Sequence, residues 1–206
     1  MKSHTQFHFE SCFISLAILL LFISLTPPSA TAASSSSALA ISKKFIKTSC
    51  NKTTYPKVCY TSLSPYAPMV GTNLKKLAKV SLSVTLKTAK NTSSAISKIS
   101  KQKGLKKMEL AIVKDCVDNV KDSIYEVQLS LKSFGNLKWN NKSDDGYAMA
   151  NIKTWISAAI TDEDTCMDGF EGQKVRASVR SSIRKYIVML AMVTSNALAI
   201  IDLVAY

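Results

Sequence analysis

The chain has 206 residues, a length typical of one domain. It carries 27 lysine and arginine residues against 14 carboxylates, a formal net charge of +13. So large a positive charge favours solubility and attraction to polyanions. No aromatic-basic motif accompanies the charge, so the sequence does not indicate nucleic-acid binding. It predicts either an attraction to acidic polysaccharide outside the cell or an ordinary solvated basic surface.

Residues 1–32 have the features of a secretory signal. Lys2 precedes an apolar run from Phe13 to Leu25, and the small residues Ala30-Thr31-Ala32 follow. The run is shorter than the roughly 20 apolar residues that a membrane-spanning helix needs. We therefore expect a signal peptide cleaved after Ala32, a secreted protein and no membrane span.

Removing this segment changes the available chemistry. Both histidines, His4 and His8, lie in it together with Cys12. The four cysteines that remain are Cys50, Cys59, Cys116 and Cys166. An even number in a secreted chain predicts two disulfides. Four cysteines allow three pairings, among which the sequence does not choose, although locality favours Cys50–Cys59.

Three N-glycosylation sequons agree with the secretory route. They begin at Asn51, Asn91 and Asn141.

Residues 33–71 are predicted to form an N-terminal helical hairpin extension. A serine-rich lead-in at 33–37 is expected to be disordered, and residues 38–64 then form two short helices closed by Cys50–Cys59. Pro56 suits the first turn of the second helix, and Thr54 is its candidate cap. Pro65 and Pro68 are expected to end the hairpin.

Four longer helices are predicted in residues 72–206, and no alternating strand pattern occurs. Their expected ranges are 72–99, 105–134, 144–161 and 175–203, and 33–206 would form one domain. Apolar residues recur in steps of three and four, as on a core-facing helix; in the second helix the stripe starts at Met108 and passes through Cys116. Short connections between such helices favour an all-α, up-down-up-down four-helix bundle.

The sequence indicates no catalytic centre. Without histidine a Ser-His-Asp arrangement cannot form, and bridged cysteines leave no thiolate nucleophile. Glu-x-x-His pairs and a Gly-rich phosphate loop are absent, so we expect no metal and no cofactor. Paired carboxylates could still hydrolyse a glycoside, but the acidic residues are predicted on exposed helix faces. The sequence therefore favours a binding protein over an enzyme.

Two acidic segments are candidate binding surfaces. Asp118, Asp122 and Glu126 step by four and share one side of the second helix; the alternative is a solvated face balanced by lysines. The second segment, 162–172, is predicted to be a loop and holds five carboxylates. Its spacing does not match an EF-hand, which argues against calcium.

Four motifs in this order resemble one family. They are Cys50…Thr54-Tyr55-Pro56…Cys59, Asp115-Cys116, Trp155-Ile-Ser157-Ala158-Ala159…Thr165-Cys166-Met-Asp168-Gly169-Phe170, and Thr194-Ser195-Asn196-Ala197-Leu198-Ala199. With the four cysteines, they are similar to the plant invertase and pectin methylesterase inhibitors.

The resemblance implies a four-helix bundle with bridges Cys50–Cys59 and Cys116–Cys166. It implies a protein of the cell wall, or apoplast, that is not an enzyme but binds one enzyme molecule and covers its active cleft. By motif it assigns target binding to Asp118, Asp122, Thr165 and Asp168. Tyr125 departs from the family pattern, because an acidic contact is expected there; the neighbouring Glu126 is a substitute.

Pectin methylesterase is the favoured target, together with weak binding to anionic pectin. The Pro-Lys-Phe tripeptide of invertase inhibitors is absent, and the basic charge and the ending of the chain suit the pectin enzyme. Acid invertase is the alternative target. Two further hypotheses remain open: a cationic wall-binding protein without an enzyme target, and a bundle related to the pro-region of an enzyme.

Overall fold

The computed structural model describes residues 30–140 and 142–204. Most of the predicted signal peptide, residues 1–29, and the sequon residue Asn141 lie outside the described residues. The chain divides into two compact units, 1–38 and 39–206. Helix α2 (Ala30–Cys50) begins within the first unit. The segment 33–37, expected to be disordered, is therefore helical; it consists of one alanine and four serines, and serine has an intermediate helix propensity.

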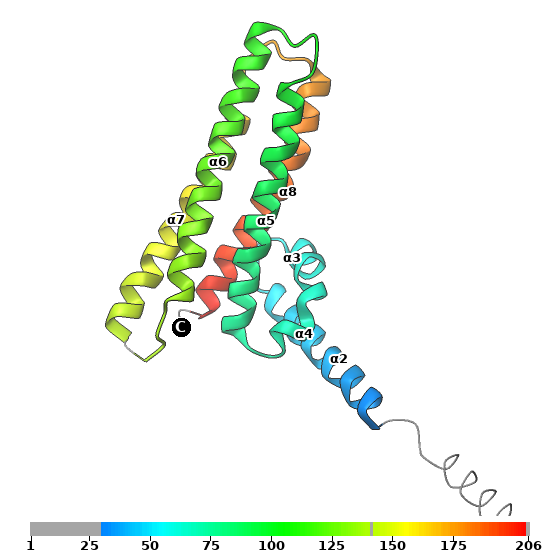
Figure 1. The fold of residues 1–206 in the computed structure, drawn as a ribbon, viewed down its shortest axis with the longest axis vertical. Helices are drawn as coiled ribbons and strands as arrows, with labels where there is room; N and C mark the ends of the chain where they lie inside the picture. Colours follow the sequence, from blue (N-terminus) through cyan, green and yellow to red (C-terminus); the bar gives the residue numbers. More distant parts are fainter. Residues whose placement is uncertain (1–29, 141, 205–206) are drawn as a thin grey trace, which may run out of the picture. The chain divides into compact units, whose positions relative to one another are not determined.

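The bundle consists of four long helices, as the sequence predicts. They are α5 (Leu74–Ser100), α6 (Lys107–Gly135), α7 (Lys142–Asp168) and α8 (Ala177–Val204). Each helix packs against the next, and α8 returns to α5, so the four form a closed ring with α5 opposite α7 (Figure 1). Among the described residues the regular elements are all helical, and the fold is the predicted up-down-up-down bundle.

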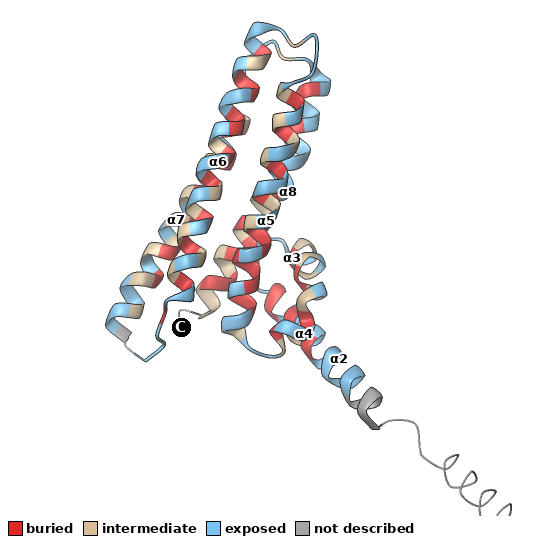
Figure 2. Ribbon diagram, viewed as in Figure 1, coloured by how far each residue is buried: buried red, intermediate tan, exposed pale blue. Residues whose placement is uncertain are grey.

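The core is built from the three- and four-residue apolar steps of these helices. Buried positions follow the inner sides of the long helices (Figure 2). They form two apolar clusters, one at each end of the bundle. One residue is an exception: Met108 was predicted on the core stripe but is 57 % exposed, because it lies in the first turn of α6, at the edge of the core.

A layer of buried polar residues separates the two clusters. Each long helix contributes one fully buried member, and the four are Thr85, Ser123, Glu163 and Thr194. Two hydrogen bonds join three of the helices at this level: Ser123 Oγ and Thr194 Oγ1 donate to Glu163 Oε1 at 2.9 Å and 2.8 Å. The carboxylates were expected on exposed helix faces, and Glu163 contradicts that expectation.

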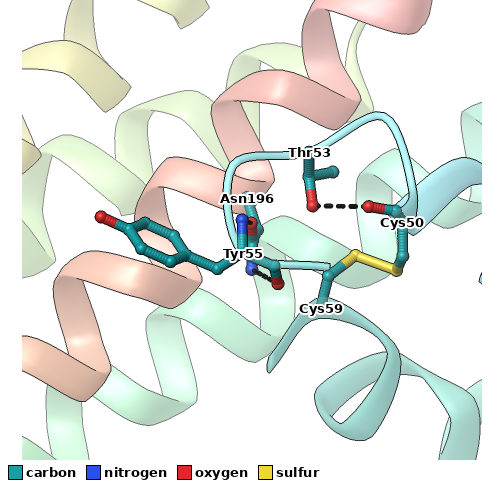
Figure 3. Close-up of a disulfide and its surroundings, with 5 residues drawn as sticks. All are labelled: Cys50, Thr53, Tyr55, Cys59 and Asn196. Atoms are coloured by element: carbon teal, nitrogen blue, oxygen red, sulfur yellow. Dashed lines mark hydrogen bonds between the residues drawn. A yellow bond between two sulfur atoms is a disulfide. The ribbon is translucent and has the colours of Figure 1, made fainter. Parts of the chain in front are cut away.

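The N-terminal hairpin packs on the α5/α8 side of the bundle. Helix α3 (Pro56–Leu63) contacts both α5 and α8, and Cys50–Cys59 ties it to α2 with 5.5 Å between the Cα atoms. Asn196 of α8 holds the connecting loop by both polar groups of its amide. Its Oδ1 accepts from the Tyr55 N–H at 2.9 Å, and its Nδ2 donates to the Tyr55 carbonyl at 3.0 Å (Figure 3).

The ends of the hairpin differ from the prediction. Tyr55, not Thr54, precedes α3, and no side chain caps it. Pro65 and Pro68 do not end the helical region; the 3-10 turn η1 (Ser64–Tyr66) and the short helix α4 (Ala67–Val70) contain them. Each proline is the second residue of its element, in the first turn, where a missing N–H costs little. Gly71, at a φ of 57°, then makes the turn into α5.

Helix α7 is longer than predicted. It continues through Asp168, so residues 162–168 are helical rather than a loop, and Cys166 lies inside the helix. Carboxylates disfavour a helix C-terminus because of the helix dipole. Here Glu163 and Cys166 are buried on the inner side, and this packing keeps the last two turns helical against that preference.

Helix α8 is long and apolar enough to cross a membrane, judged by length and composition only. Its most apolar window has a mean hydropathy of 2.1, and 44 % of that window is buried. The core helix of a bundle meets the same test, and α8 packs against α5 and α7.

Candidate functional site

Charge is distributed unequally around the ring of helices. Helices α6 and α7 carry 11 of the 14 carboxylates in the chain. Along the described length of α5 and α8 there are nine lysine and arginine residues and one carboxylate, Asp202. Because α6 and α7 are neighbours in the ring, the bundle of this basic protein has one acidic side.

The second disulfide sets how α6 and α7 are aligned. Cys116 and Cys166 are bridged, as the resemblance implies, with their Cα atoms 4.3 Å apart. The helices are antiparallel, so Asp118 and Thr165 both lie within two residues of this crossing. Farther along, Ser123 on α6 is opposite Glu163 on α7. The bridge thus brings Asp118, Asp122 and Glu126, the acidic row of α6, next to the last turns of α7.

Asp122 and Glu126 of α6 lie near Asp162 of α7, and we call the surface formed by these three carboxylates the acidic seam. Burial, followed by the charges of Asp122 and Glu126, raises the pKa of Asp162 to about 6. Burial also raises the pKa of Glu126, with a smaller effect from Asp122. Among the described residues Oε2 of Glu126 is buried without a hydrogen-bond partner. The seam is therefore an electronegative surface, and in the described part of the chain Asp122, Glu126 and Asp162 form no salt bridge.

The four residues assigned by resemblance all lie on α6 and α7 and are all exposed. Asp118 forms a 2.7 Å salt bridge with Lys121 on its own helix. Thr165 Oγ1 donates to the Thr161 carbonyl at 2.8 Å, which leaves its oxygen free to accept a further hydrogen bond. Asp168 is the last residue of α7. Helical spacing puts Asp162, Thr165 and Asp168 on one side of α7.

Tyr125, the departure from the family pattern, is 59 % exposed on the same helix as the acidic row. Its ring offers an apolar surface and a hydroxyl where the pattern has a carboxylate. Glu126 is half-buried beside Asp162, so it contributes negative charge at the seam, not at the position of Tyr125.

Asp162 belongs to this surface; the resemblance did not assign it, although it lies in the acidic segment 162–172 that the sequence indicates as a candidate. Residues 162–172 were expected to form a separate loop, whereas α7 continues and carries Asp162 beside Asp122. The sequence does contain a pattern that predicts the longer helix. Its core-facing residues follow in steps of three and four: Ile152, Ile156, Ala159, Glu163 and Cys166. That stripe predicts a helix through Cys166.

A second buried carboxylate, Glu109, has a structural role. It joins the start of α6 to the start of α8, because Arg176 Nε donates to its Oε1 at 3.0 Å and the Arg176 N–H does so at 2.9 Å. These bonds, with one from the Lys106 N–H, lower the pKa of Glu109 to about 2. Glu109 is ionised and saturated with donors, so it is not available to a ligand.

The acidic seam can accept hydrogen bonds and neutralise positive charge. Carboxylates form their strongest hydrogen bonds with arginine and lysine. Within residues 30–140 and 142–204, no three histidine, cysteine, aspartate or glutamate side chains are grouped to hold a metal ion. The surface can therefore accept cationic or hydroxyl groups of a ligand.

Comparison with known proteins places the chain in a family. The family model for plant invertase/pectin methylesterase inhibitors matches residues 44–200. Over 161 residues the chain is 41 % identical to pectinesterase inhibitor 10 of Arabidopsis thaliana, covering 78 % of this chain and 51 % of that protein. It therefore spans about half of that relative's length.

Two further comparisons agree. The 21 kDa protein of Daucus carota is 42 % identical over 163 residues, 79 % of this chain and 84 % of that protein. A crystal structure of mutant form A of a pectin methylesterase inhibitor from Arabidopsis has the same fold. Its TM-score is 0.60 at 23 % identity, over 76 % of this chain and 95 % of that one. This chain belongs to the plant invertase/pectin methylesterase inhibitor family.

Proposed function

We propose that this protein inhibits pectin methylesterase and has no catalytic activity of its own. The observation that carries the proposal is the acidic seam of α6 and α7 in a chain of this family. The family includes relatives named pectinesterase inhibitors, such as the 41 % identical protein of Arabidopsis thaliana.

The mechanism we propose is steric blockade in a one-to-one complex. Exposed Asp118, Asp122 and Asp168 accept hydrogen bonds at the rim of the enzyme's active cleft, and Thr165 adds its hydroxyl. The rigid helices then exclude the polymer substrate. Specific complexes of this kind bury about 1,600 Å² in total. The disulfide between α6 and α7 fixes the binding residues of the two helices relative to each other before binding, which lowers the entropy lost on association.

The protein acts outside the cell, in the wall, after cleavage of a signal peptide at residues 1–32. Two of its three candidate glycosylation sites, Asn51 and Asn91, are exposed as an acceptor asparagine must be. The third, Asn141, lies outside the described residues. The net charge of +13 supports weak retention on anionic pectin.

Acid invertase is the second enzyme to test, because the family description names it. The Pro-Lys-Phe tripeptide expected of an invertase inhibitor is absent from this sequence. Pectin methylesterase therefore remains the favoured target.

The experiment is an inhibition assay of the purified, oxidised protein against both enzymes in parallel. Loss of pectin methylesterase activity at near-equimolar inhibitor, with invertase unaffected, is the expected result. Inhibition of invertase alone would change the target. A folded protein that inhibits neither enzyme would reject the proposal in favour of a wall-binding role.

A further inference from the structure

A groove lies between α5 and α8, the two basic helices. Its volume is about 590 Å³, and residues 91–102 line one wall and residues 182–186 the other. Ala95 and the buried Ile99 contribute apolar surface to it. Sites for small ligands typically have volumes of about 300–1,000 Å³, with an apolar lining and a few polar groups. The groove has the size of such a site, and its more polar lining suits a hydrophilic ligand.

Each wall of the groove carries an exposed lysine, Lys98 from α5 and Lys185 from α8. Neither forms a salt bridge or a side-chain hydrogen bond with any residue in the described ranges. No carboxylate lines the groove, and the single carboxylate of α5 and α8, Asp202, lies at the other end of α8. Two ammonium groups thus border one groove without a counter-ion among the described residues, which favours an anionic ligand.

The remaining side chains suit a sugar. Tyr186 is 42 % exposed at the groove, and its ring can pack against the C–H face of a pyranose. Asn91 and Gln102 are exposed at the same groove, and their amides can each donate to and accept from sugar hydroxyls. No side-chain hydrogen bond occupies either amide within the described chain. Cations, an aromatic ring and free amides together match a saccharide that carries carboxylates.

We propose that the α5/α8 groove is a binding site for an acidic oligosaccharide made of uronate units. Lys98 and Lys185 bind carboxylates, Tyr186 packs against a ring, and the two amides bind hydroxyls. The acidic seam is formed by the other two helices, so the protein can hold the polymer and an enzyme at once. This site does not depend on the proposed inhibition, and either can fail without the other.

The position of Asn91 at the groove determines the choice of expression host. Asn91 begins a sequon, so an N-glycan there would start at the groove itself and would occupy the amide that the proposed site uses. The site is proposed for the chain without a glycan at Asn91. The protein is therefore produced in an oxidising bacterial periplasm, where the disulfides form and no N-glycan is added. Trigalacturonate is the probe, and its fully methyl-esterified form, which has no charge, is the comparison ligand.

Binding is measured by calorimetry and by amide chemical-shift changes. We expect trigalacturonate to bind, with shifts concentrated at residues 91–102 and 182–186, and the methyl ester to bind at least about tenfold more weakly because its carboxylates are blocked. The double variant Lys98→Ala/Lys185→Ala should lose about tenfold or more in affinity. Tyr186→Ala should weaken binding of the same probe.

The matched control is Lys76→Ala/Lys79→Ala, which removes two exposed lysines from α5 outside the groove. It should change affinity by no more than about twofold at moderate ionic strength, where surface charges are screened. Equal losses in both double variants would mean non-specific attraction to a basic surface and would overturn the proposal. Absence of binding, or equal binding of the methyl ester, would also overturn it. Inhibition of pectin methylesterase, measured in parallel, should be unchanged in Lys98→Ala/Lys185→Ala.

Discussion

Thr194 Oγ1 of α8 donates a 2.8 Å hydrogen bond to Glu163 Oε1 of α7 in the middle of the bundle core. Burial is the main cause that raises the pKa of Glu163 to about 8. The hydrogen bonds from Thr194 and Ser123 act against it, and the charges of Asp164 and Asp162 act in the same direction as burial. The carboxyl group is therefore neutral at acidic and neutral pH. A neutral carboxyl suits this site, where Oε2 has no hydrogen-bond partner among the described residues.

This buried carboxyl should make the stability of the protein depend on pH. The pKa of Glu163 is higher in the folded than in the unfolded chain, so its contribution is complete below the unfolded pKa near 4.5 and is lost as pH rises through about 8. We expect Glu163→Gln, which mimics the neutral form, to flatten the fall in unfolding free energy between these values. At pH 8 the unfolding free energy of Glu163→Gln should exceed that of the unchanged protein by on the order of 1–3 kcal/mol. Urea denaturation at several pH values measures it, with the exposed Glu171→Gln as control; an unchanged slope in Glu163→Gln would refute the assignment.

Asn196 should matter for stability through the hairpin. Its amide satisfies both backbone groups of Tyr55, and Asn196→Ala would leave a part-buried donor and acceptor without partners. The expected loss of unfolding free energy is about 1–3 kcal/mol. Denaturation compares it with Ser195→Ala, the neighbouring half-buried residue, which should change little. Equal effects of the two changes would show that the hydrogen bonds to Tyr55 contribute nothing.

The two disulfides should differ in their contributions. In the loop-entropy model, bridging residues nine apart stabilises by about 2.7 kcal/mol and bridging residues 50 apart by about 4 kcal/mol. All four cysteines are buried, so paired Cys→Ala replacements avoid placing new polar groups in the core. Chemical denaturation should rank Cys116→Ala/Cys166→Ala as the less stable variant. The reverse order would indicate that the α2–α3 link holds more of the fold than its loop length suggests.

Asp162 should titrate near pH 6, and the charge of Asp122 is one cause. Asp122→Asn removes that repulsion and should lower the pKa of Asp162 by roughly half a unit to one unit. Carboxyl carbon NMR titration follows the group directly. Asp115→Asn, also on α6 but not among the groups that shift Asp162, should leave the titration in place. An unchanged pKa of Asp162 in Asp122→Asn would show that the charge of Asp122 does not act on Asp162.

Asp118 and Asp168 are exposed and outside the core, so their removal should separate inhibition from folding. We expect Asp118→Ala/Asp168→Ala to weaken inhibition about tenfold or more while Tm stays nearly unchanged. The control Glu171→Ala/Asp202→Ala removes the same charge from outside α6 and α7. If Tm and inhibition fall together, these aspartates have a structural role instead.

The order of motifs along the chain predicted the family, and through it the bundle and both disulfides. Thr194 and Asn196 belong to the stretch Thr194–Ala199 that resembles a frequent ending of the family. The structure gives physical reasons for both: Thr194 binds Glu163, and Asn196 binds Tyr55. Neither partner could be inferred from the sequence, because each lies more than 30 residues away and on another element.

The sequence by itself determined the helical class, the four long helices and the absence of histidine beyond residue 8, because periodicity and composition are local properties. Only the tertiary structure decided where charge lies and where helices end. Carboxylates of similar sequence context became a core acid at Glu163, a helix link at Glu109 and an open seam at Asp122 and Asp162. Burial and neighbouring charges set these differences, and both depend on which helices the bundle brings together.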